Sequence, residues 1–444
     1  MKRKYELISM LVMVFILTGC QLNVTTEVVD PHIYVATDGD DKNPGTIEEP
    51  LLSLEAAAEK ATAGTIVNIR EGTYYEPLII QHSGTETEPV QFQAYQDEEV
   101  HISGAQLEDG PDDIALIEVD GYSYITIDGL AIADLTTENA EKTVMGILIT
   151  GDSQHIQLSN NTIEDISTYA IEGNAHGIAV YGNEAIGNID IHQNTLTNLK
   201  LGLSEALVVN GDVSQFTITE NHVYETDNIG IDVIGYEGVA TNSSQDYARD
   251  GVISGNEVHH NSSFENPSYA KDYSAAGIYV DGGSRILIED NIVYQNDIGI
   301  EATSEHKDKF ADEIDILNNE VYENSYTGIS IGGYDSQRGG TSNTLISGNT
   351  LIDNDTEGLE GAQLLFQYHT YSNRIEHNKM TASSTGLFIS NEYQENEDTH
   401  FSQNYYYQED QTRPRWLWRN EDAHSLKDFQ MLTDSDAESV YTRF

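Results

Sequence analysis

The chain has 444 residues, of which 38% are hydrophobic and 22% charged, and this composition supplies enough apolar side chains for a large folded core. Its 75 acidic residues outnumber its 21 basic residues, and the formal net charge of −54 excludes nucleic acid as a partner, because so negative a surface repels phosphate groups. Cys20 is the only cysteine, which excludes an intrachain disulfide and a thiolate metal cluster.

The N-terminal segment has the pattern of a bacterial lipoprotein signal. A basic start precedes an apolar run, Ile8 to Leu17, that is too short to span a bilayer and ends in the sequence LTGC (17–20). These four residues resemble the lipobox of bacterial lipoproteins, in which the cysteine thiol is acylated and the preceding peptide is removed. The resemblance implies that residues 1–19 are a signal peptide, that Cys20 carries the lipid, and that residues 20–30 form a tether. The alternative is an ordinary secretory signal peptide.

Residues 31–114 are predicted to form an N-terminal cap and the first coils of a repeated structure. Strand-like alternation begins at His32, and Ser53 is placed to cap a helix over 54–63 that Gly64 ends. Further period-two segments follow this helix. The helix is expected to cover the open N-terminal end of the strands.

Two sequence markers recur in the same phase through residues 115–410. One is an asparagine within an x-Asn-x-apolar tetrad, found at Asn161, Asn194, Asn221, Asn256, Asn291, Asn319, Asn349, Asn378 and Asn404. The other is a Gly-apolar pair that opens a strand, found at Gly146, Gly177, Gly230, Gly277, Gly299, Gly328 and Gly386, with Ala206 in the same slot. The segments between the markers alternate at period two and show no helical periodicity.

A repeat of short alternating strands and sharp turns predicts an all-β parallel β-helix, whose coils stack about 4.8 Å apart. The apolar residues of each opening strand are expected to fill the core and the residues between them to face solvent. The recurring asparagines are expected to form a ladder along one turn. Such a solenoid needs a cap at each end, so residues 411–444 are assigned to a C-terminal cap. Trp416 and Trp418 are expected to form its apolar plug, and an aromatic platform for sugars is the alternative.

The longest gap between opening pairs, from Gly230 to Gly277, contains two insertions. They cover residues 235–250 and 262–276. Because functional residues concentrate in loops that a rigid scaffold holds in place, we expect these insertions to form the wall of a cleft.

Carboxylates occupy outward positions of the opening strands in three consecutive coils, when the coils from Leu148 to Ser330 are aligned. Asp232 and Glu301 share a column two coils apart, about 9.6 Å, and Asp281 lies diagonally between them, about 8 Å from either. These three residues are the candidate catalytic residues and also the candidate ligands of a calcium ion. The candidates for substrate binding around them are Tyr236, Glu237, Tyr279, His306 and Lys307.

Two chemistries fit this acidic patch. Clustered carboxylates can hold calcium through oxygen ligands. Alternatively, two carboxyls on either side of a glycosidic bond can act as general acid and general base. The alternative to both is an acidic face that only interacts with solvent.

Segments 34–46 and 69–76 resemble the opening of many right-handed β-helix proteins, among them the family 9 pectate lyases and several β-helix glycoside hydrolases. With the repeats, the resemblance covers residues 32–410 and implies a right-handed β-helix that acts on a polysaccharide. Family 9 lyases use an aspartate-bound calcium ion and a lysine base, within a segment rich in Asp-Asp-Gly-Trp-Asp that this sequence lacks. The candidates for such a base are Lys271, Lys307 and Lys309.

The sequence therefore predicts a monomeric, lipid-anchored protein on the extracytoplasmic face of the cell membrane that processes a polysaccharide. A pectate-lyase-like lyase acting on a uronate-containing glycan is the first interpretation. The alternatives are a β-helix glycoside hydrolase that uses an Asp/Glu pair and a surface protein that binds carbohydrate without catalysis. Electrostatics favour the hydrolase, because a surface this negative attracts a uronate only through calcium or local lysines.

Overall fold

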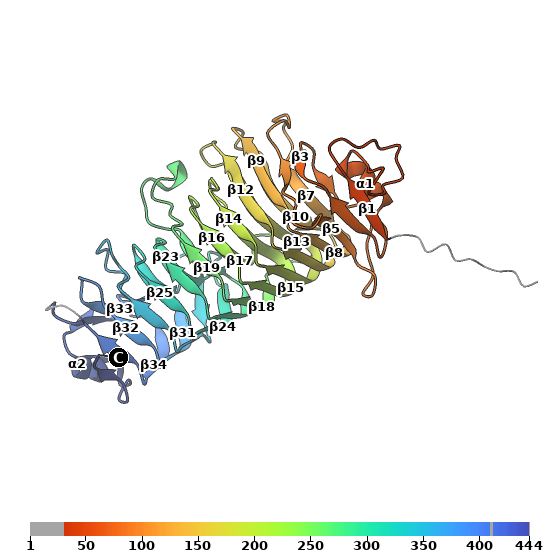
Figure 1. Cartoon of the computed structure of the whole chain (residues 1–444). Helices are drawn as coiled ribbons and strands as arrows, with labels where there is room; N and C mark the ends of the chain where they lie inside the picture. Colours follow the sequence, from red (N-terminus) through yellow and green to blue (C-terminus); the bar gives the residue numbers. More distant parts are fainter. Residues whose placement is uncertain (1–30, 409–411, 444) are drawn as a thin grey trace, which may run out of the picture. The chain divides into compact units, whose positions relative to one another are not determined.

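The period-two segments of the sequence form strands that pair in parallel with equivalent strands of neighbouring coils (Figure 1). The computed structural model describes residues 31–408 and 412–443. The predicted signal peptide, the lipid site at Cys20 and the tether lie outside the described residues. Within the described part of the chain, no helix is long and apolar enough to cross a membrane.

The coils form a parallel β-helix, as predicted, and contribute strands to three faces. Among the described residues, the strands of two faces join into a sheet of 25 strands, and those of the third face form a sheet of 13 strands. The opening face contains β4 (Leu78–Ile79), β7 (Ile114–Asp120), β10 (Thr143–Thr150), the first parts of β13 (Asn174–His192) and β15 (Leu207–Thr219), β17 (Ile231–Ile234), β20 (Ala276–Asp281), β23 (Ile298–Thr303), β26 (Thr327–Ile331), β30 (Leu364–Phe366), β33 (Leu387–Asn391), β36 (Arg415–Trp418) and β37 (Glu421–Ala423). The antiparallel pair β36–β37 ends this face.

The second and third faces follow the opening face along each coil. The second face contains β1 (His32–Val35), β2 (Ile66–Ile69), β5 (Val90–Ala94), β8 (Ser123–Asp128), β11 (Gln154–Ser159), the later parts of β13 and β15, β18 (Arg249–Ser254), β21 (Ser284–Glu289), β24 (Phe310–Leu317), β27 (Gly340–Ser342), β28 (Leu345–Ser347), β31 (Thr370–Glu376) and β34 (Glu397–Ser402). The third face contains β3 (Gly72–Tyr74), β6 (Val100–Ser103), β9 (Ala131–Thr137), β12 (Thr162–Thr168), β14 (Thr195–Thr197), β16 (His222–Tyr224), β19 (Glu257–His259), β22 (Ile292–Tyr294), β25 (Glu320–Tyr322), β29 (Thr350–Ile352), β32 (Lys379–Thr381), β35 (Tyr405–Tyr407) and β38 (Val440–Tyr441).

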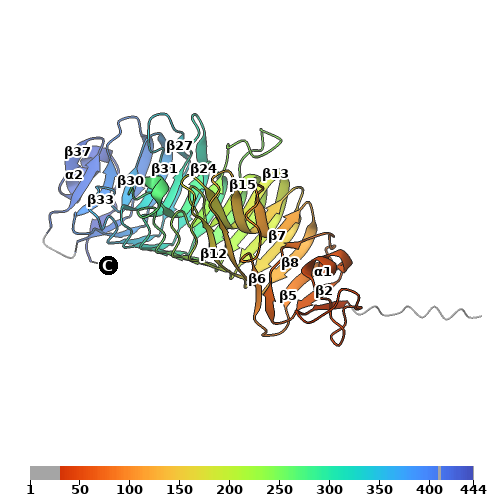
Figure 2. The same ribbon diagram turned by 90° about the horizontal axis from the view of Figure 1, so that it is seen from above.

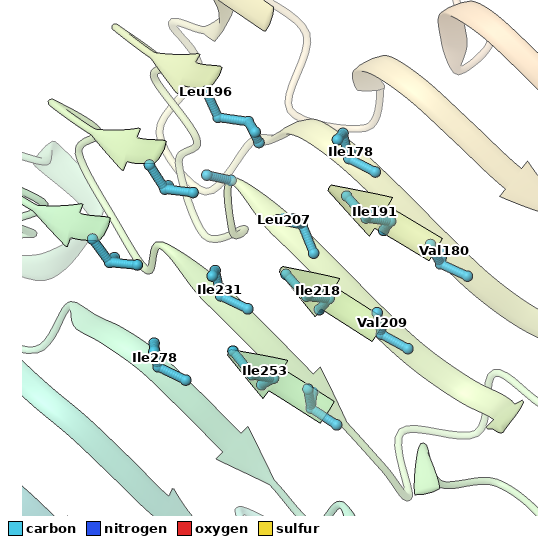
Figure 3. Packing of buried hydrophobic residues seen from close by; sticks show 14 of the residues in the cluster. Ile178, Val180, Ile191, Leu196, Leu207, Val209, Ile218, Ile231, Ile253 and Ile278 are labelled. Carbon is cyan, nitrogen blue, oxygen red and sulfur yellow. The ribbon is translucent and has the colours of Figure 1, made fainter. Parts of the chain in front are cut away.

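The interior between the faces is filled by stacked aliphatic side chains, which confirms the predicted core. Figure 3 shows two such columns, one from the opening face and one from the second face. They consist of Ile178, Leu207, Ile231 and Ile278, and of Ile191, Ile218 and Ile253, all fully buried. Removing this aliphatic surface from water is the main force that holds consecutive coils together.

The glycine of the opening pair is required by close packing at the turn. A Cβ atom added to Gly277 would lie 2.7 Å from Val293 Cγ1 and 2.8 Å from Asn296 Nδ2. Both distances are well inside van der Waals contact, so a larger residue would displace the turn. This explains why glycine marks the start of the strand in most coils.

The predicted asparagine ladder is confirmed over its full length, from Asn161 to Asn404. At its centre, Asn291 Oδ1 accepts hydrogen bonds from the main-chain N–H and the Nδ2 of Asn256, both at 2.9 Å. Asn291 Nδ2 donates to the carbonyl of Ile253 and to Asn319 Oδ1, both at 2.9 Å. Each side chain therefore satisfies polar groups of two adjacent coils, which a buried turn requires.

A second asparagine ladder follows the turn at the other end of the third face, and the sequence analysis did not anticipate it. It runs through Asn261, Asn296, Asn324 and Asn354 and ends on Gln363. All four asparagines are fully buried, and Asn296, Asn324 and Asn354 each accept from the main-chain N–H of the preceding member.

Helices cover both ends of the described coils (Figure 2). Helix α1 (Leu54–Lys60) begins at Ser53, whose side chain accepts from the Ala56 N–H, and packs against the first strands as predicted. It ends earlier than the predicted residue 63, because Ala61 takes extended backbone angles.

At the C-terminal end, Trp416 and Trp418 are buried, so they form the predicted plug and not a sugar platform. Helix α2 (Leu426–Thr433), which the sequence analysis did not anticipate, contributes Phe429 to this plug.

Candidate functional site

The predicted register of the opening strands is correct. Strand pairing places Asp232 opposite Tyr279, Tyr279 opposite Glu301, and Glu301 opposite Ser330. Carboxylates therefore occupy outward positions of β17, β20 and β23. The earlier strand β7 adds Glu118 in the same column, opposite Leu148, so the column's carboxylates are not confined to the three predicted coils.

The expectation that these side chains face solvent is wrong. Asp232 is 2% exposed, Tyr279 and Asp281 are 5% exposed, and Glu301 is 7% exposed. The side chains do point away from the core of the β-helix, but an apolar cluster lies among them on the outward side of the opening strands. Ala276, Tyr279 and Ile298 form this cluster, and Ile229 and Tyr326 pack against it.

The insertion at 262–275 forms one wall over this face, as predicted. Its 3-10 helix η1 (Pro267–Tyr269) and the following residues bring Tyr269, Tyr273 and Ser274 to a cleft. The buried carboxylate of Asp297 holds both ends of the insertion, because it accepts from the Ser262 and Ser263 hydroxyls and from the main-chain N–H groups of Ser263, Ser274 and Ala275.

This cleft, which we call the tyrosine cleft, has a volume of about 440 Å³. It is lined by Leu203, Ile229, Tyr269, Tyr273, Ser274, Tyr279, Ile298, Glu301, Glu305, Tyr326, Tyr334 and Gln367. Rings and carboxyls in one concave site are typical of sugar binding, where one face of the ligand is apolar and its edges carry hydroxyls.

Glu301 is the buried acid of the tyrosine cleft. Its Oε1 accepts from Ser330 Oγ at 3.1 Å and from Gln367 Nε2 at 3.0 Å. Burial raises the pKa of Glu301 to about 7, and the nearby carboxylate of Glu305 adds to the effect. Glu301 is therefore protonated over much of the range below neutral pH and can donate a proton.

Glu305 lies at the rim of the same cleft in a different environment. Its Oε2 accepts from the Tyr334 hydroxyl at 3.4 Å and lies 3.7 Å from Arg338 Nη1. Asp281 fixes this position, because its Oδ1 accepts from the Glu305 main-chain N–H at 2.6 Å. Burial, and next the charge of Glu305, raise the pKa of Asp281 well above its ordinary value. Asp281 therefore does not line the tyrosine cleft itself but contacts the main chain of Glu305, which does.

Asp232 lines neither the tyrosine cleft nor a smaller cleft of about 330 Å³, which is lined by Thr143, Asn174, His176, Tyr181, Leu203, Ser204, Glu205, Asn210, Ile234 and Glu237. The Oδ1 atom of Asp232 is buried and has no hydrogen-bond partner. Burial raises the pKa of Asp232 well above its ordinary value, and Glu205 adds to this. The two clefts share Leu203 and so adjoin each other.

The smaller cleft contains a histidine–tyrosine pair that the sequence analysis missed. His176 Nε2 and the Tyr181 hydroxyl are 2.8 Å apart, and His176 Nδ1 lies 3.0 Å from the carbonyl of Glu205. Burial lowers the pKa of His176 to about 4, so its ring is neutral. His176 and Glu205 each stand directly before the pair that opens a strand. The residues at this position in neighbouring coils are apolar or small, namely Met145, Ile229 and Ala276. This contrast is the signal that could have identified them.

The predicted substrate-binding residues are divided between the clefts and the surface. Tyr279 lines the tyrosine cleft, and Glu237 lines the smaller cleft, where its Oε2 accepts from Asn210 Nδ2 at 2.7 Å. Tyr236 stacks on Tyr247 outside the lining of both clefts. His306 and Lys307 line neither cleft, and their assignment stays a prediction.

The lysines considered as a catalytic base also lie outside these two clefts. Lys271 pairs with Glu265 and lies over the ring of Phe264. Lys309 Nζ lies 4.5 Å from the centre of the Tyr236 ring.

A calcium site at Asp232, Asp281 and Glu301 stays a prediction. Within residues 31–408 and 412–443, one set of three or more His, Cys, Asp or Glu residues has its ligand atoms all within 4.8 Å of one another, and that set lies on the third face. The three carboxylates of the opening face do not form such a set.

Two family models of right-handed β-helices together match residues 33–411 of the chain. Residues 33–206 match the model of a Pel9A-like, right handed beta helix region, and residues 146–337 and 274–411 match the model of a right handed beta helix region. The chain is 47% identical over 410 residues to the uncharacterized protein YwoF of Bacillus subtilis, which covers 92% of this chain and 87% of that protein.

Two further proteins resemble the chain, one over a short stretch of sequence and the other in fold. The chain is 42% identical over 89 residues to pectate lyase PEL9 of Emericella nidulans, which is 20% of this chain and 22% of that enzyme. The crystal structure of the GH136 lacto-N-biosidase from Eubacterium ramulus superposes with a TM-score of 0.57 at 16% identity, over 93% of this chain and 67% of that one. At this identity the likeness shows a shared fold alone.

Proposed function

The chain belongs to the family of right-handed β-helix proteins, as predicted, and on this basis we propose that it is an enzyme that hydrolyses glycosidic bonds in the tyrosine cleft. The observation that carries the proposal is the pairing of two unlike carboxyls in one cleft. Glu301 is buried and protonatable near neutral pH, whereas Glu305 lies at the rim, where its Oε2 is 3.7 Å from Arg338 Nη1.

Unlike carboxyls are what glycoside hydrolysis requires. We assign Glu301 as the general acid that gives its proton to the leaving glycosidic oxygen. Glu305 is the carboxylate that either activates a water molecule or attacks the anomeric carbon. Asp281 is a positioning residue, because it acts through its hydrogen bond to the Glu305 main chain. Tyr269, Tyr273 and Tyr326 supply rings for the sugar faces.

The acidity of the site favours a neutral glycan over a uronate. No lysine or arginine lines either cleft to pair with the carboxylate of a uronate, and the net charge of the chain is −54. The Pel9A-like match ends at residue 206, before the strands that carry Asp232, Asp281 and Glu301.

A calcium-dependent lyase acting on a uronate is the second candidate. The observation in its favour is the Pel9A-like match over residues 33–206, together with the short stretch of identity to pectate lyase PEL9. In this case calcium bound near Asp232 and Asp281 would bridge the carboxylates of the protein and the substrate.

The test is incubation with a panel of neutral and uronic oligosaccharides, with and without calcium. Reducing ends report hydrolysis, and ultraviolet absorbance of unsaturated products reports elimination. We expect reducing ends from a neutral glycan, lowered about 100-fold or more in Glu301→Gln. Glu118→Gln is the matched control, because Glu118 occupies the same outward column in β7, away from both clefts. Unsaturated products that require calcium would favour the lyase instead.

We also propose that the protein works on the outer face of the cell membrane, anchored through Cys20. The LTGC sequence at 17–20 supports this proposal.

A further inference from the structure

A cluster of histidine and carboxylate side chains lies on the third face, away from the opening-face clefts. Strand pairing sets His222 of β16 opposite Glu257 of β19, and Tyr224 of β16 opposite His259 of β19. Strand β22 continues the second column with Tyr294 (β16 and β19 are labelled in Figure 1). His222, Glu257 and His259 are all half-buried, so the cluster is open to solvent on one side.

The donor atoms of this cluster converge on one point. His222 Nε2 and His259 Nε2 are 2.8 Å apart, and a carboxylate oxygen of Glu257 completes a set whose atoms all lie within 4.8 Å of one another. Two imidazole nitrogens at this separation share a single proton, or they direct two lone pairs at a cation. Two nitrogens and one oxygen form a donor set that zinc prefers, and ligand atoms bound at about 2.0 to 2.2 Å lie a few ångströms from one another.

Neighbouring side chains hold the donors in place, as outer-shell partners do around metals. The Tyr294 hydroxyl donates to Glu257 Oε1 at 3.0 Å. The Nδ1 atoms of His259 and His260 are 2.6 Å apart, so the second nitrogen of His259 also has a partner. The ring of Tyr224 stacks on the rings of His222 and His259, with centroid separations of 4.3 Å and 5.1 Å.

We propose that His222, Glu257 and His259 bind a divalent transition-metal ion of the zinc type, with one coordination position open to water or to a small anion. The site differs in chemistry from the calcium site predicted on the opening face, because two of its three donors are nitrogen. It does not rest on the proposed hydrolase activity.

The site has a structural consequence for the insertion that walls the tyrosine cleft. β19 ends at His259, and the insertion begins at Ser262, three residues later. A metal ion that joins β16 to β19 fixes the strand from which this wall departs.

The test is zinc titration of the chelator-treated full chain by calorimetry, in millimolar calcium so that surface carboxylates are already occupied. We expect one zinc per chain, and binding that is weakened about 100-fold or more in His222→Ala and in His259→Ala. Tyr294→Phe, which removes an outer-shell partner, should weaken binding about 10-fold. His155→Ala is the matched control, because His155 is an exposed histidine stacked on a tyrosine, Tyr124, in another coil.

Cobalt replaces zinc in a second measurement, because four-coordinate Co²⁺ bound by nitrogen shows visible d–d bands. We expect these bands in the unaltered chain and their loss in His259→Ala, with circular dichroism confirming that each variant is folded. Zinc binding that is unchanged in both histidine variants would assign the ion to surface carboxylates and overturn the proposal. Absence of one-to-one binding by the folded, unaltered chain would overturn it equally and leave His222 and His259 as a hydrogen-bonded pair.

Discussion

Glu301 gives the fold a pH dependence whose sign and size follow from its surroundings. Burial raises its pKa from an ordinary 4.5 to about 7. A carboxyl with a higher pKa in the folded chain than in the unfolded chain binds its proton more tightly when folded. Its stabilising contribution is therefore complete below pH 4.5 and is lost as the pH rises through about 7.

The size of this loss is set by the difference between the two pKa values. A shift from 4.5 to about 7 corresponds to about 3 kcal/mol in the free energy of unfolding between about pH 4.5 and about pH 8. Glu301→Gln removes the titration but keeps an amide oxygen to accept from Ser330 and Gln367. The unaltered chain should therefore lose about 3 kcal/mol more than the variant over this range.

Thermal unfolding followed by circular dichroism at both pH values measures the difference. At about pH 8 the variant should melt about 3 to 4 °C above the unaltered chain, given an unfolding entropy of about 2.1 cal/mol/K per residue. Glu118→Gln is the comparison variant, because burial also raises the pKa of this half-buried glutamate, so removing it should change the pH dependence in the same direction. Equal pH dependence in the unaltered chain and Glu301→Gln would refute the reasoning.

Three further changes test other parts of the structure. Asn291→Ala should lower the free energy of unfolding in urea by about 1 to 3 kcal/mol, because ladder groups of two coils lose their partners; a smaller effect would mean that the turn adapts. Asp297→Ala should free the insertion at 262–275, so limited proteolysis should cut there sooner than in the unaltered chain, and equal cutting rates would show that other contacts hold it. Cys20→Ser should release the protein from the cell membrane into the medium, and equal membrane retention would refute the lipid anchor.

The fold was predictable because every coil repeats the same physical requirements. A glycine fits where the turn packs against the next strand, two aliphatic residues alternate into the core, and an asparagine satisfies the turn. The second ladder carried an equally regular signal, since Asn261, Asn296, Asn324 and Asn354 each follow a first-ladder asparagine by five residues. Alignment on the first ladder alone left that second column unexamined.

The burial of the site was not predictable from the opening strands alone, because residues of other coils complete it. Register alone placed Asp232, Tyr279 and Glu301 in one column. Gln367, which donates to Glu301, lies 66 residues further along the chain. Nothing in the alternation of β23 indicates that Gln367, which follows β30 two coils later, donates to Glu301. Outward positions in a solenoid are exposed only where no insertion crosses them, and here the insertions determine the chemistry.

The pH dependence of turnover separates the two candidate reactions by its sign. A hydrolase that uses Glu301 as general acid needs this carboxyl protonated, so kcat/KM should fall as the pH rises through about 7. A lyase needs a deprotonated base, so its rate should rise over the same interval. The measurement is initial rate against pH on the glycan identified from the panel, with Glu118→Gln as the control. A falling alkaline limb that is absent from the residual activity of Glu301→Gln would assign the titration to this residue. A rising limb would show that the buried carboxyls serve the fold or a calcium ion and not proton donation.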